Sequence, residues 1–216
     1  MAYRRTESVA RRLAEREQSI VDAARAAAEQ GGMSAVQIAN VAERAGIAAG
    51  TVYRYFPAKT DLVGELISAV AVRELAAIRA AADAAPGPLS ALAAALGTFA
   101  ARLIRERRLA WAVLAEPIDQ KTDEARLEFR KAIIDELASR IRIAMVHKHL
   151  PEQDVVIAAP AIVGALLEGL IGPQAPALDG DRGKTRPAVQ NATLLALRAL
   201  GVVDARARGL VLQSPA

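Results

Sequence analysis

The chain has 216 residues and a formal net charge of +4, and 53% of its residues are hydrophobic but only 3% are aromatic. No apolar run approaches the roughly 18 residues that a membrane-spanning helix needs, so we expect no membrane partner. The absence of cysteine excludes disulfide frameworks and thiolate metal sites. Alanine and leucine supply most of the apolar mass and alternating β-branched runs are scarce, which predicts an all-α protein. The Arg-rich start lacks an apolar signal core, so a cytoplasmic location is expected.

The first predicted helix follows a short basic arm. Residues 1–8 are expected to be loose, and a helical pattern then runs from about Val9 to Gln30, where Gly31 and Gly32 end it. The first sixteen residues hold five arginines against two glutamates. Such an arm beside a basic helix suits a dimer that sums its phosphate contacts over two half-sites.

Two short helices joined by a glycine turn come next. Ser34 and Gln37 fit a capping box that would open the first helix, and the turn lies at Ala45–Gly46. The second helix spans about 48–56, and Pro57 ends it. This layout is typical of a helix-turn-helix, whose second helix lies in the major groove of DNA.

The second short helix and the residues after it carry chemistry that suits DNA. A glycine lets the backbone approach closely, a threonine can contact a base edge, and an arginine fork can hold guanine or phosphate. Phenols and a lysine at the start of the next helix can bind phosphates. The aromatic residues could instead form only a hinge core, which is the favoured role for Phe56. The predicted DNA-binding residues here are Ala49, Gly50, Thr51, Tyr53, Arg54, Tyr55 and Lys59.

The ordered motifs of this region resemble the N-terminal head of the tetracycline-repressor (TetR) family of bacterial transcriptional regulators. The likeness covers less than a third of the chain and runs through Ile20–Ala24, Gly31–Gly32, Val41–Ile47 and Gly50–Lys59. It implies a homodimeric repressor whose variable helical C-terminal domain senses a small molecule.

The same resemblance assigns several of these positions to DNA contact. It implies that Thr51, Tyr53, Tyr55 and Lys59 meet DNA, and that Gln37, near the start of the second helix, contacts a phosphate. The family often has polar residues at the positions of Ala48 and Ala49. We therefore expect base selection to depend on Thr51, Arg54, apolar contacts with thymine and DNA shape.

The rest of the chain is predicted to be a helical bundle. A helix from Lys59 to about Ala84 ends before Pro86–Gly87–Pro88, and a loop is expected at 173–186. Further helices are predicted near 89–106, 108–116, 122–149, 152–172 and 187–200. The predicted organisation is a basic arm and helix start at 1–18, a helix-turn-helix domain at 19–65, an effector-binding and dimerisation domain at 66–203, and a flexible tail at 204–216.

The last two predicted helices of the bundle suggest how two copies associate. The helices near 152–172 and 187–200 are apolar on nearly all sides, so each must be buried on two sides. They could complete the core of the monomer or form a four-helix seam between two subunits. A DNA-binding head that reads two half-sites favours the homodimer.

An apolar pocket for a small-molecule effector is predicted around Trp111, because such pockets lie between the helices of bundles. Glu168 is unusual because a carboxylate in an apolar helix must be paired, line a cavity or face a partner subunit. Arg130 is another polar candidate. Each of these residues could instead belong to a plain core. The predicted ligand-binding residues are Phe99, Leu103, Trp111, Leu114, Glu116, Phe129, Ile133, Met145, Leu166, Glu168 and Leu170.

Catalytic and metal-binding motifs are not found in the sequence, so neither an enzyme nor a cofactor is expected. His147 and His149, two apart on a predicted helix, would point to nearly opposite sides and could not share a metal. The favoured function is a repressor released from a palindromic operator in double-stranded DNA by a largely apolar effector. The alternatives are an architectural helical DNA-binding protein without an effector and a helical-bundle enzyme. A cavity of roughly several hundred cubic ångströms near Trp111 would favour the sensor, and a solid core the architectural protein.

Overall fold

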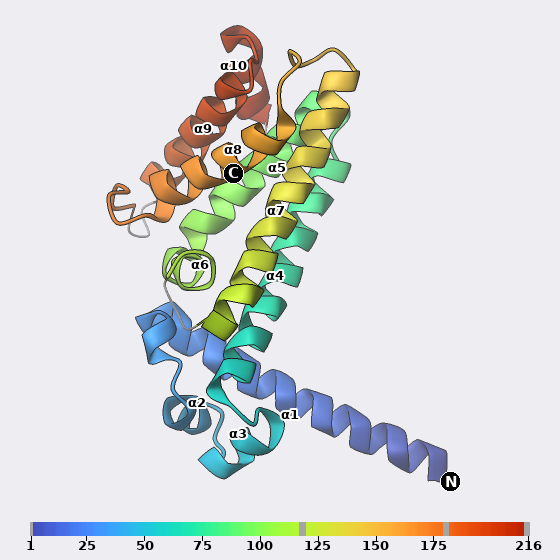
Figure 1. Cartoon of the computed structure of the whole chain (residues 1–216), viewed down its shortest axis with the longest axis vertical. Helices are drawn as coiled ribbons and strands as arrows, with labels where there is room; N and C mark the ends of the chain where they lie inside the picture. The colour runs from blue at the N-terminus through green and yellow to red at the C-terminus, as the bar shows by residue number, and fades with distance from the viewer. Residues whose placement is uncertain (1, 117–119, 179–181, 214–216) are drawn as a thin grey trace.

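The structure is a computed structural model that describes residues 2–116, 120–178 and 182–213. Within these residues it consists of helices without any strand, which confirms the all-α prediction (Figure 1). None of the described helices is both long and apolar enough to cross a membrane. The elements are α1 (Ala2–Gly31), the 3₁₀ helix η1 (Met33–Ala35), α2 (Ile38–Arg44), α3 (Ala49–Tyr55), α4 (Lys59–Asp83), α5 (Pro88–Arg105), α6 (Arg107–Leu114), α7 (Gln120–Val146), α8 (Val155–Ile171), α9 (Arg182–Ala199) and α10 (Asp204–Gln213).

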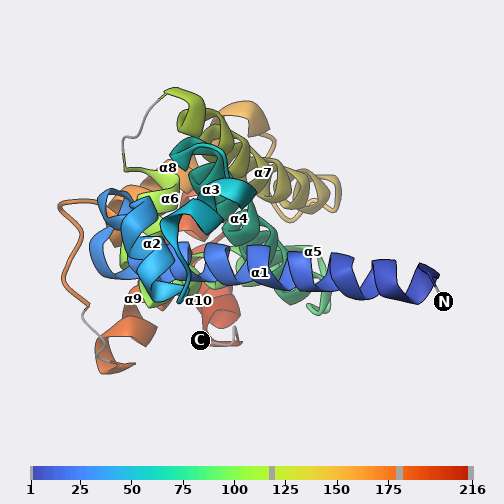
Figure 2. The same cartoon turned by 90° about the horizontal axis from the view of Figure 1, so that it is seen from below.

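Helix α1 is longer than predicted. It is helical from Ala2, so the loose arm expected over residues 1–8 is wrong from that residue onward. Ala, Arg and Glu make up most of residues 2–30, which contain no glycine or proline to break a helix. Its first half projects beside the body, with residues 9–18 exposed (Figures 1 and 2). Its second half buries Ile20 and Ala24 against the neighbouring helices.

Helices α1, α2 and α3 form a small head with its own core. Val41, Val52 and Phe56 are buried between them, so Phe56 has the core role favoured for it from the sequence. Gly46 has a φ of 65°, a left-handed conformation that glycine adopts without steric cost, and it makes the turn between α2 and α3. The turn and the bounds of α3 agree with the prediction to within one residue.

The capping box predicted at Ser34 and Gln37 does not form. The Ser34 hydroxyl donates to the Gly31 carbonyl, 3.1 Å away, and helps to close the 3₁₀ turn η1. The Gln37 amide donates to the Ser34 carbonyl, 2.9 Å away, and α2 begins one residue later at Ile38. The Ser34 side chain, which the sequence pattern assigned to the cap of α2, therefore forms a hydrogen bond at the 3₁₀ turn instead.

Helix α4 joins the head to the body. The Asp61 carboxylate accepts a hydrogen bond from the Ala58 amide at 3.0 Å and fixes the start of this helix. From there α4 runs along α5 and α7, while α8 and α9 pack on the other side of α5 (Figure 1). Leu92 and Leu96 of α5 are fully buried, so α5 is the centre of the bundle.

The C-terminal region differs from the prediction in two places. Residues 204–213, expected to belong to a flexible tail, form α10, which packs on α9 and α5 through the buried Ala207 and Val211. Residues 214–216 lie outside the described part. The loop expected at 173–186 is shorter, because α9 begins at Arg182 and holds Pro187 near its start; residues 179–181 of that loop are outside the described residues. Pro187 therefore lies inside α9 and did not mark the start of the helix.

Candidate nucleic-acid interface and cavity

The exposed side of α3 carries most of the predicted DNA-binding residues. Ala49, Gly50, Tyr53 and Arg54 are exposed at the end of the head, which Figure 2 shows from below, and Thr51 is half-buried. The Tyr53 ring is 51% exposed although it is aromatic, so packing within the monomer does not account for it. The structure therefore brings these residues to one accessible surface.

Gly50 is not required by the packing of the head. A Cβ atom built at this position would meet nothing within 4 Å, and its φ lies outside the left-handed range. An alanine would be more stable in a helix by about 0.5–1 kcal/mol. Packing within the monomer therefore does not require a glycine at this position.

The remaining predicted DNA-binding residues flank α3. Tyr55 is half-buried against the core, and the Arg54 guanidinium lies 5.8 Å from the centre of its ring, a cation–π distance. Lys59 is the first residue of α4, beside the amide ends of that helix, where phosphates are favoured. Gln37 is exposed at the start of α2.

A cavity lies between α4, α5, α6 and α7, close to the place predicted for an effector. Phe99, Leu103, Leu114 and Phe129 line it, as predicted. Its volume of about 20 Å³ is room for about one water molecule. The core around α6 is therefore nearly closed, and a larger ligand would have to open it. The other lining residues are Val70, Glu74, Arg102, Glu106, Leu109, Ala110 and Val113.

The other predicted ligand-binding residues do not line this cavity. Ile133 is core, Trp111 and Arg130 are half-buried, and Met145 lies near the far end of α7. Leu166 and Leu170 line a groove on the outer side of α8 and α9 instead.

Two predicted acidic residues lie away from the cavity for identifiable reasons. Glu168 is exposed, and a Cβ atom added to Gly172 would lie 2.7 Å from its carboxyl carbon, so the side chain folds back over the helix end. The Glu116 carboxylate accepts a hydrogen bond from the Met33 amide at 3.2 Å. Glu116 therefore ties the end of α6 to the head.

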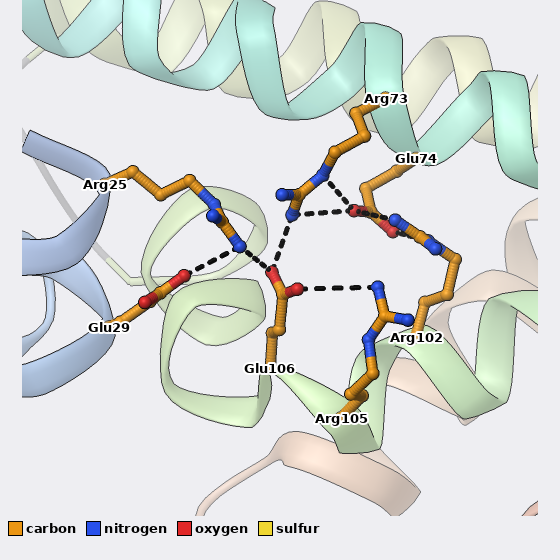
Figure 3. A network of polar contacts seen from close by, with 7 residues as sticks. All are labelled: Arg25, Glu29, Arg73, Glu74, Arg102, Arg105 and Glu106. Atoms are coloured by element: carbon orange, nitrogen blue, oxygen red, sulfur yellow. Dashed lines mark hydrogen bonds and ion pairs between the residues drawn. The ribbon is translucent and has the colours of Figure 1, made fainter. Parts of the chain in front are cut away.

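Seven charged residues form a network beside the cavity, and the sequence analysis missed all of them. Glu106, between α5 and α6, accepts hydrogen bonds from Arg25 of α1 at 2.8 Å and from Arg73 of α4 at 2.6 Å (Figure 3). Arg102 of α5 holds both oxygens of Glu74, and Arg73 also reaches Glu74. Glu29 and Arg105 complete the network at its edges.

The sequence signal for this network is slight. Arg25 and Glu29 are spaced as neighbours on one helix, and the pairs Arg73–Glu74 and Arg105–Glu106 are adjacent in sequence. The contacts that join the different helices have no such signal, since Arg25 and Glu106 are 81 residues apart. Burial by itself raises the pKa of the Glu106 carboxyl, but the hydrogen bonds and charges of Arg25 and Arg73 outweigh burial and lower that pKa. The hydrogen bond with Glu74 likewise raises the pKa of Arg102. Glu106 is therefore held as a carboxylate that joins the head to the body.

The outer faces of α8 and α9 form an open groove of about 710 Å³. Small and apolar residues, among them Ala165, Gly169, Ala192 and Leu195, line most of it. The Leu195 side chain is 61% exposed, although it belongs to one of the two helices predicted to be buried on both sides. The monomer thus covers one side of these helices and leaves the other open.

The two histidines lie side by side, contrary to the prediction. Helix α7 ends at Val146, and Lys148 adopts a φ of 59°, so the chain leaves the helix before His149. The ring centres of His147 and His149 are 6.3 Å apart and the rings are stacked. Among the described residues no group of three or more His, Asp or Glu side chains could hold a metal ion.

Comparison with known proteins identifies the head. Residues 20–66 match the sequence model of the bacterial regulatory proteins of the tetR family, and this range covers the second part of α1, all of α2 and α3, and the start of α4. The head of the chain therefore has the sequence features of the tetR family. The TetR resemblance seen in the sequence is thereby confirmed.

Curated members of the tetR family match the same region. The transcriptional repressor KstR of Rhodococcus jostii is 49% identical over 73 residues, which are 34% of this chain and 32% of that protein. KstR of Mycolicibacterium smegmatis is 51% identical over 71 residues, 33% of each chain. The match spans only about a third of the length of these relatives, so it says little about the body.

Solved structures of the family resemble the whole fold. The fatty acid degradation regulator FadR of Bacillus halodurans has a TM-score of 0.74 and 22% identity, covering 87% of this chain and 97% of that one. RolR in complex with resorcinol has a TM-score of 0.68 and 20% identity, covering 96% and 98%. FadR of Bacillus subtilis in complex with stearoyl-CoA has a TM-score of 0.70 and 18% identity, covering 86% and 98%. At these identities the likeness shows the fold alone.

Proposed function

We propose that the protein is a homodimeric transcriptional repressor that binds a palindromic operator and leaves it when a small, largely apolar effector binds the body. The observation that carries this proposal is the exposed surface of α3, in a head about half identical to the heads of named repressors. Helix α3 enters the major groove in this proposal, and each subunit reads one half-site.

The surface of α3 suggests how bases and phosphates are contacted. Gly50 brings the backbone close to the DNA, and Thr51 and Ala49 contact base edges or thymine methyl groups. Arg54 holds a guanine or a phosphate, while Tyr53, Tyr55, Lys59 and Gln37 bind the phosphates around them. Since so few side chains offer hydrogen bonds to bases, DNA shape contributes to the choice of sequence.

The open side of α8 and α9 supports a dimer. Two copies of the groove would meet as a four-helix seam, in which the small residues let the helices approach closely. Such a seam would cover the exposed Leu195 and place two heads on the same side of DNA. In the DNA-bound form the two α3 helices would lie about 34–36 Å apart, one turn of the double helix.

Two structural neighbours are complexes with small molecules, RolR with resorcinol and FadR of Bacillus subtilis with stearoyl-CoA. An effector that enters between α4 and α7 here would have to widen the small cavity and would move α4, whose first turn carries Lys59. The heads would then lose their spacing. To change mostly bound protein into mostly released protein, the effector must prefer the released form by about 5.5 kcal/mol.

Selection of bound fragments from random duplex DNA tests the proposal, and a palindromic site is expected. Tyr53→Ala and Lys59→Ala should weaken binding to all selected sequences alike, and Lys59→Ala should flatten the dependence of affinity on salt. Lys131→Ala, at an exposed lysine of α7, is the matched control. Equal affinity for the selected site and a scrambled duplex would refute a specific operator.

The oligomeric state can be measured by analytical ultracentrifugation. Leu195→Glu places a charge in the groove of α8 and α9 and should produce monomers with weaker operator binding. Val72→Glu is the control, because Val72 of α4 is 72% exposed but lies outside that groove. A wild-type protein that is monomeric at micromolar concentration would contradict the dimer.

The nearly closed core favours one alternative, an architectural DNA-binding protein without an effector. If the body serves only to hold two heads together, no ligand has to enter its core, and a nearly closed cavity is expected. Operator affinity in the presence of a broad set of apolar and amphipathic compounds separates the two functions. A repressor of the proposed kind loses affinity with at least one of them, whereas the architectural protein responds to none.

A further inference from the structure

The wall of the small cavity combines two kinds of residue. Eight of its eleven lining residues are apolar, whereas Glu74, Arg102 and Glu106 are charged. These three belong to one chain of contacts, because Arg102 holds Glu74 and Arg73 bridges Glu74 and Glu106. The polar wall of the cavity is therefore part of the ion network of Figure 3, and the other four residues of that network, Arg25, Glu29, Arg73 and Arg105, do not line the cavity.

Arginine exceeds glutamate in this network. It contains four arginines and three glutamates, so its formal charge is positive (Figure 3). Glu106 is contacted by three arginines and Glu74 by two, so both carboxylates are already neutralised. One hydrogen-bond donor of the network also lacks an acceptor: Nε of Arg25 is buried and has no hydrogen-bond partner in the described part of the chain.

We infer that the effector carries an acidic group on its apolar body, and that Arg102, the arginine among the lining residues, binds this group as an anion. This inference rests on the proposed function and specifies the chemistry of its effector. A fourth negative charge would balance the four arginines, whereas a cation would meet carboxylates that arginines already shield. Arginine binds a carboxylate through two parallel N–H donors, which a neutral alcohol cannot match.

The arrangement also explains the position of the charges. Arg102 and Glu74 have side chains only 16% and 15% exposed, in contact with the apolar lining. Burying such a pair is costly compared with an apolar contact, and it gives little net stability. Helix packing alone does not require a charged pair at this position. Binding of a ligand anion by the guanidinium of Arg102, which also holds Glu74, would account for the pair.

The test compares ligands that differ only in their head group. Isothermal calorimetry on the full-length protein without DNA measures the binding of straight-chain carboxylates from butanoate to dodecanoate, each with its matching alcohol and amine. The best carboxylate should bind about tenfold or more tightly than its alcohol, the equivalent of one charge-assisted hydrogen bond, and the amine should bind most weakly. If no carboxylate binds better than its alcohol, including the case in which none binds, the inference is wrong.

Two arginine variants localise the effect. Arg102→Gln should abolish the preference for the carboxylate. Arg79→Gln is the matched control, because Arg79 also lies on the bundle, pairs with Glu136 at 2.9 Å and does not line the cavity, and this variant should keep the preference. A preference that survives in Arg102→Gln would show that Arg102 serves only helix packing, and would overturn the inference.

If Arg102→Gln does not fold, Arg102→Lys replaces it. Lysine keeps the charge but loses the planar fork, so the preference should fall, and an unchanged preference would contradict the inference. The failure of this inference is distinguishable from the failure of the proposed function. Binding of the head to a selected palindromic site is measured separately and does not depend on the outcome of the calorimetry.

Discussion

Two glycines in the head have opposite roles, although both border α3. Gly46 has a φ of 65°, which a residue with a Cβ atom adopts only with strain, while Gly50 has an ordinary conformation and open space around it. The first glycine serves the fold. The second serves the surface that we assign to DNA.

This difference gives a prediction at the residue scale. Gly46→Ala should destabilise the protein by about 1–2 kcal/mol because of the left-handed conformation. Gly50→Ala should stabilise it by about 0.5–1 kcal/mol, because alanine is the better helix former. Urea denaturation followed by circular dichroism measures both changes.

The same pair of variants separates stability from binding. Gly50→Ala should bind the selected operator more weakly in spite of its greater stability, because the added methyl group faces the DNA. Unchanged or tighter operator binding by Gly50→Ala would refute the close backbone approach at this position.

Among the elements, α10 shows how a short helix depends on tertiary packing. An isolated helix of ten residues is marginal in water, so its stability comes from contacts with α9 and α5. Ala207 and Val211 make these contacts, one helical turn apart, and Arg198 of α9 pairs with Asp204 at its first residue.

We predict that Val211→Asp releases α10 from the body. The variant loses the burial of the valine, about 1.5–3 kcal/mol, and places a carboxylate in an apolar contact. Limited trypsin digestion should then cleave rapidly after Arg206 and Arg208 of α10. Leu212→Asp is the control, since Leu212 is 72% exposed. Equal cleavage rates in the two variants would show that α10 is not held by its buried face.

At the scale of the whole molecule, Glu106 joins three parts of the fold. It lies between α5 and α6 and receives hydrogen bonds from α1 of the head and from α4. Arg108 adds a second link, because its guanidinium donates to the Gly31 carbonyl at 3.0 Å. Charged side chains thus link the body to the head in addition to α4.

The lowered pKa of Glu106 predicts an effect of acid. The pKa of the Glu106 carboxyl is lower in the folded protein than in the unfolded chain, where the pKa of a glutamate is about 4.3. Glu106 therefore stabilises the folded protein fully at a pH above this unfolded pKa. This stabilisation is lost as the pH falls through the folded pKa. Glu106→Gln should therefore lower the midpoint of thermal unfolding at neutral pH and lose less stability on acidification than wild type. Glu128→Gln, at an exposed glutamate of α7, should behave like wild type in both respects.

The sequence by itself determined what depends on local pattern. Glycine and proline mark the ends of α1, α2 and α3, and apolar residues at helical spacing mark their buried faces, so the head and its exposed residues were predictable. The failures were also local. Ser34 fits a helix cap in the sequence, but its side chain belongs to a 3₁₀ turn. Helix α10 was missed because it is short, and the two buried positions Ala207 and Val211 are too few to show helical periodicity.

Only the tertiary structure decided which distant residues meet. The network around Glu106 joins residues from α1, α4 and the junction of α5 and α6, and nothing in their sequence positions shows that they are neighbours. The same holds for the cavity and for the outward position of Glu168, because helical periodicity defines an apolar face but not the helix that covers it. The surface that we propose for DNA is therefore predictable from consecutive residues, whereas the site that we propose for the effector depends on how helices far apart in the chain pack together.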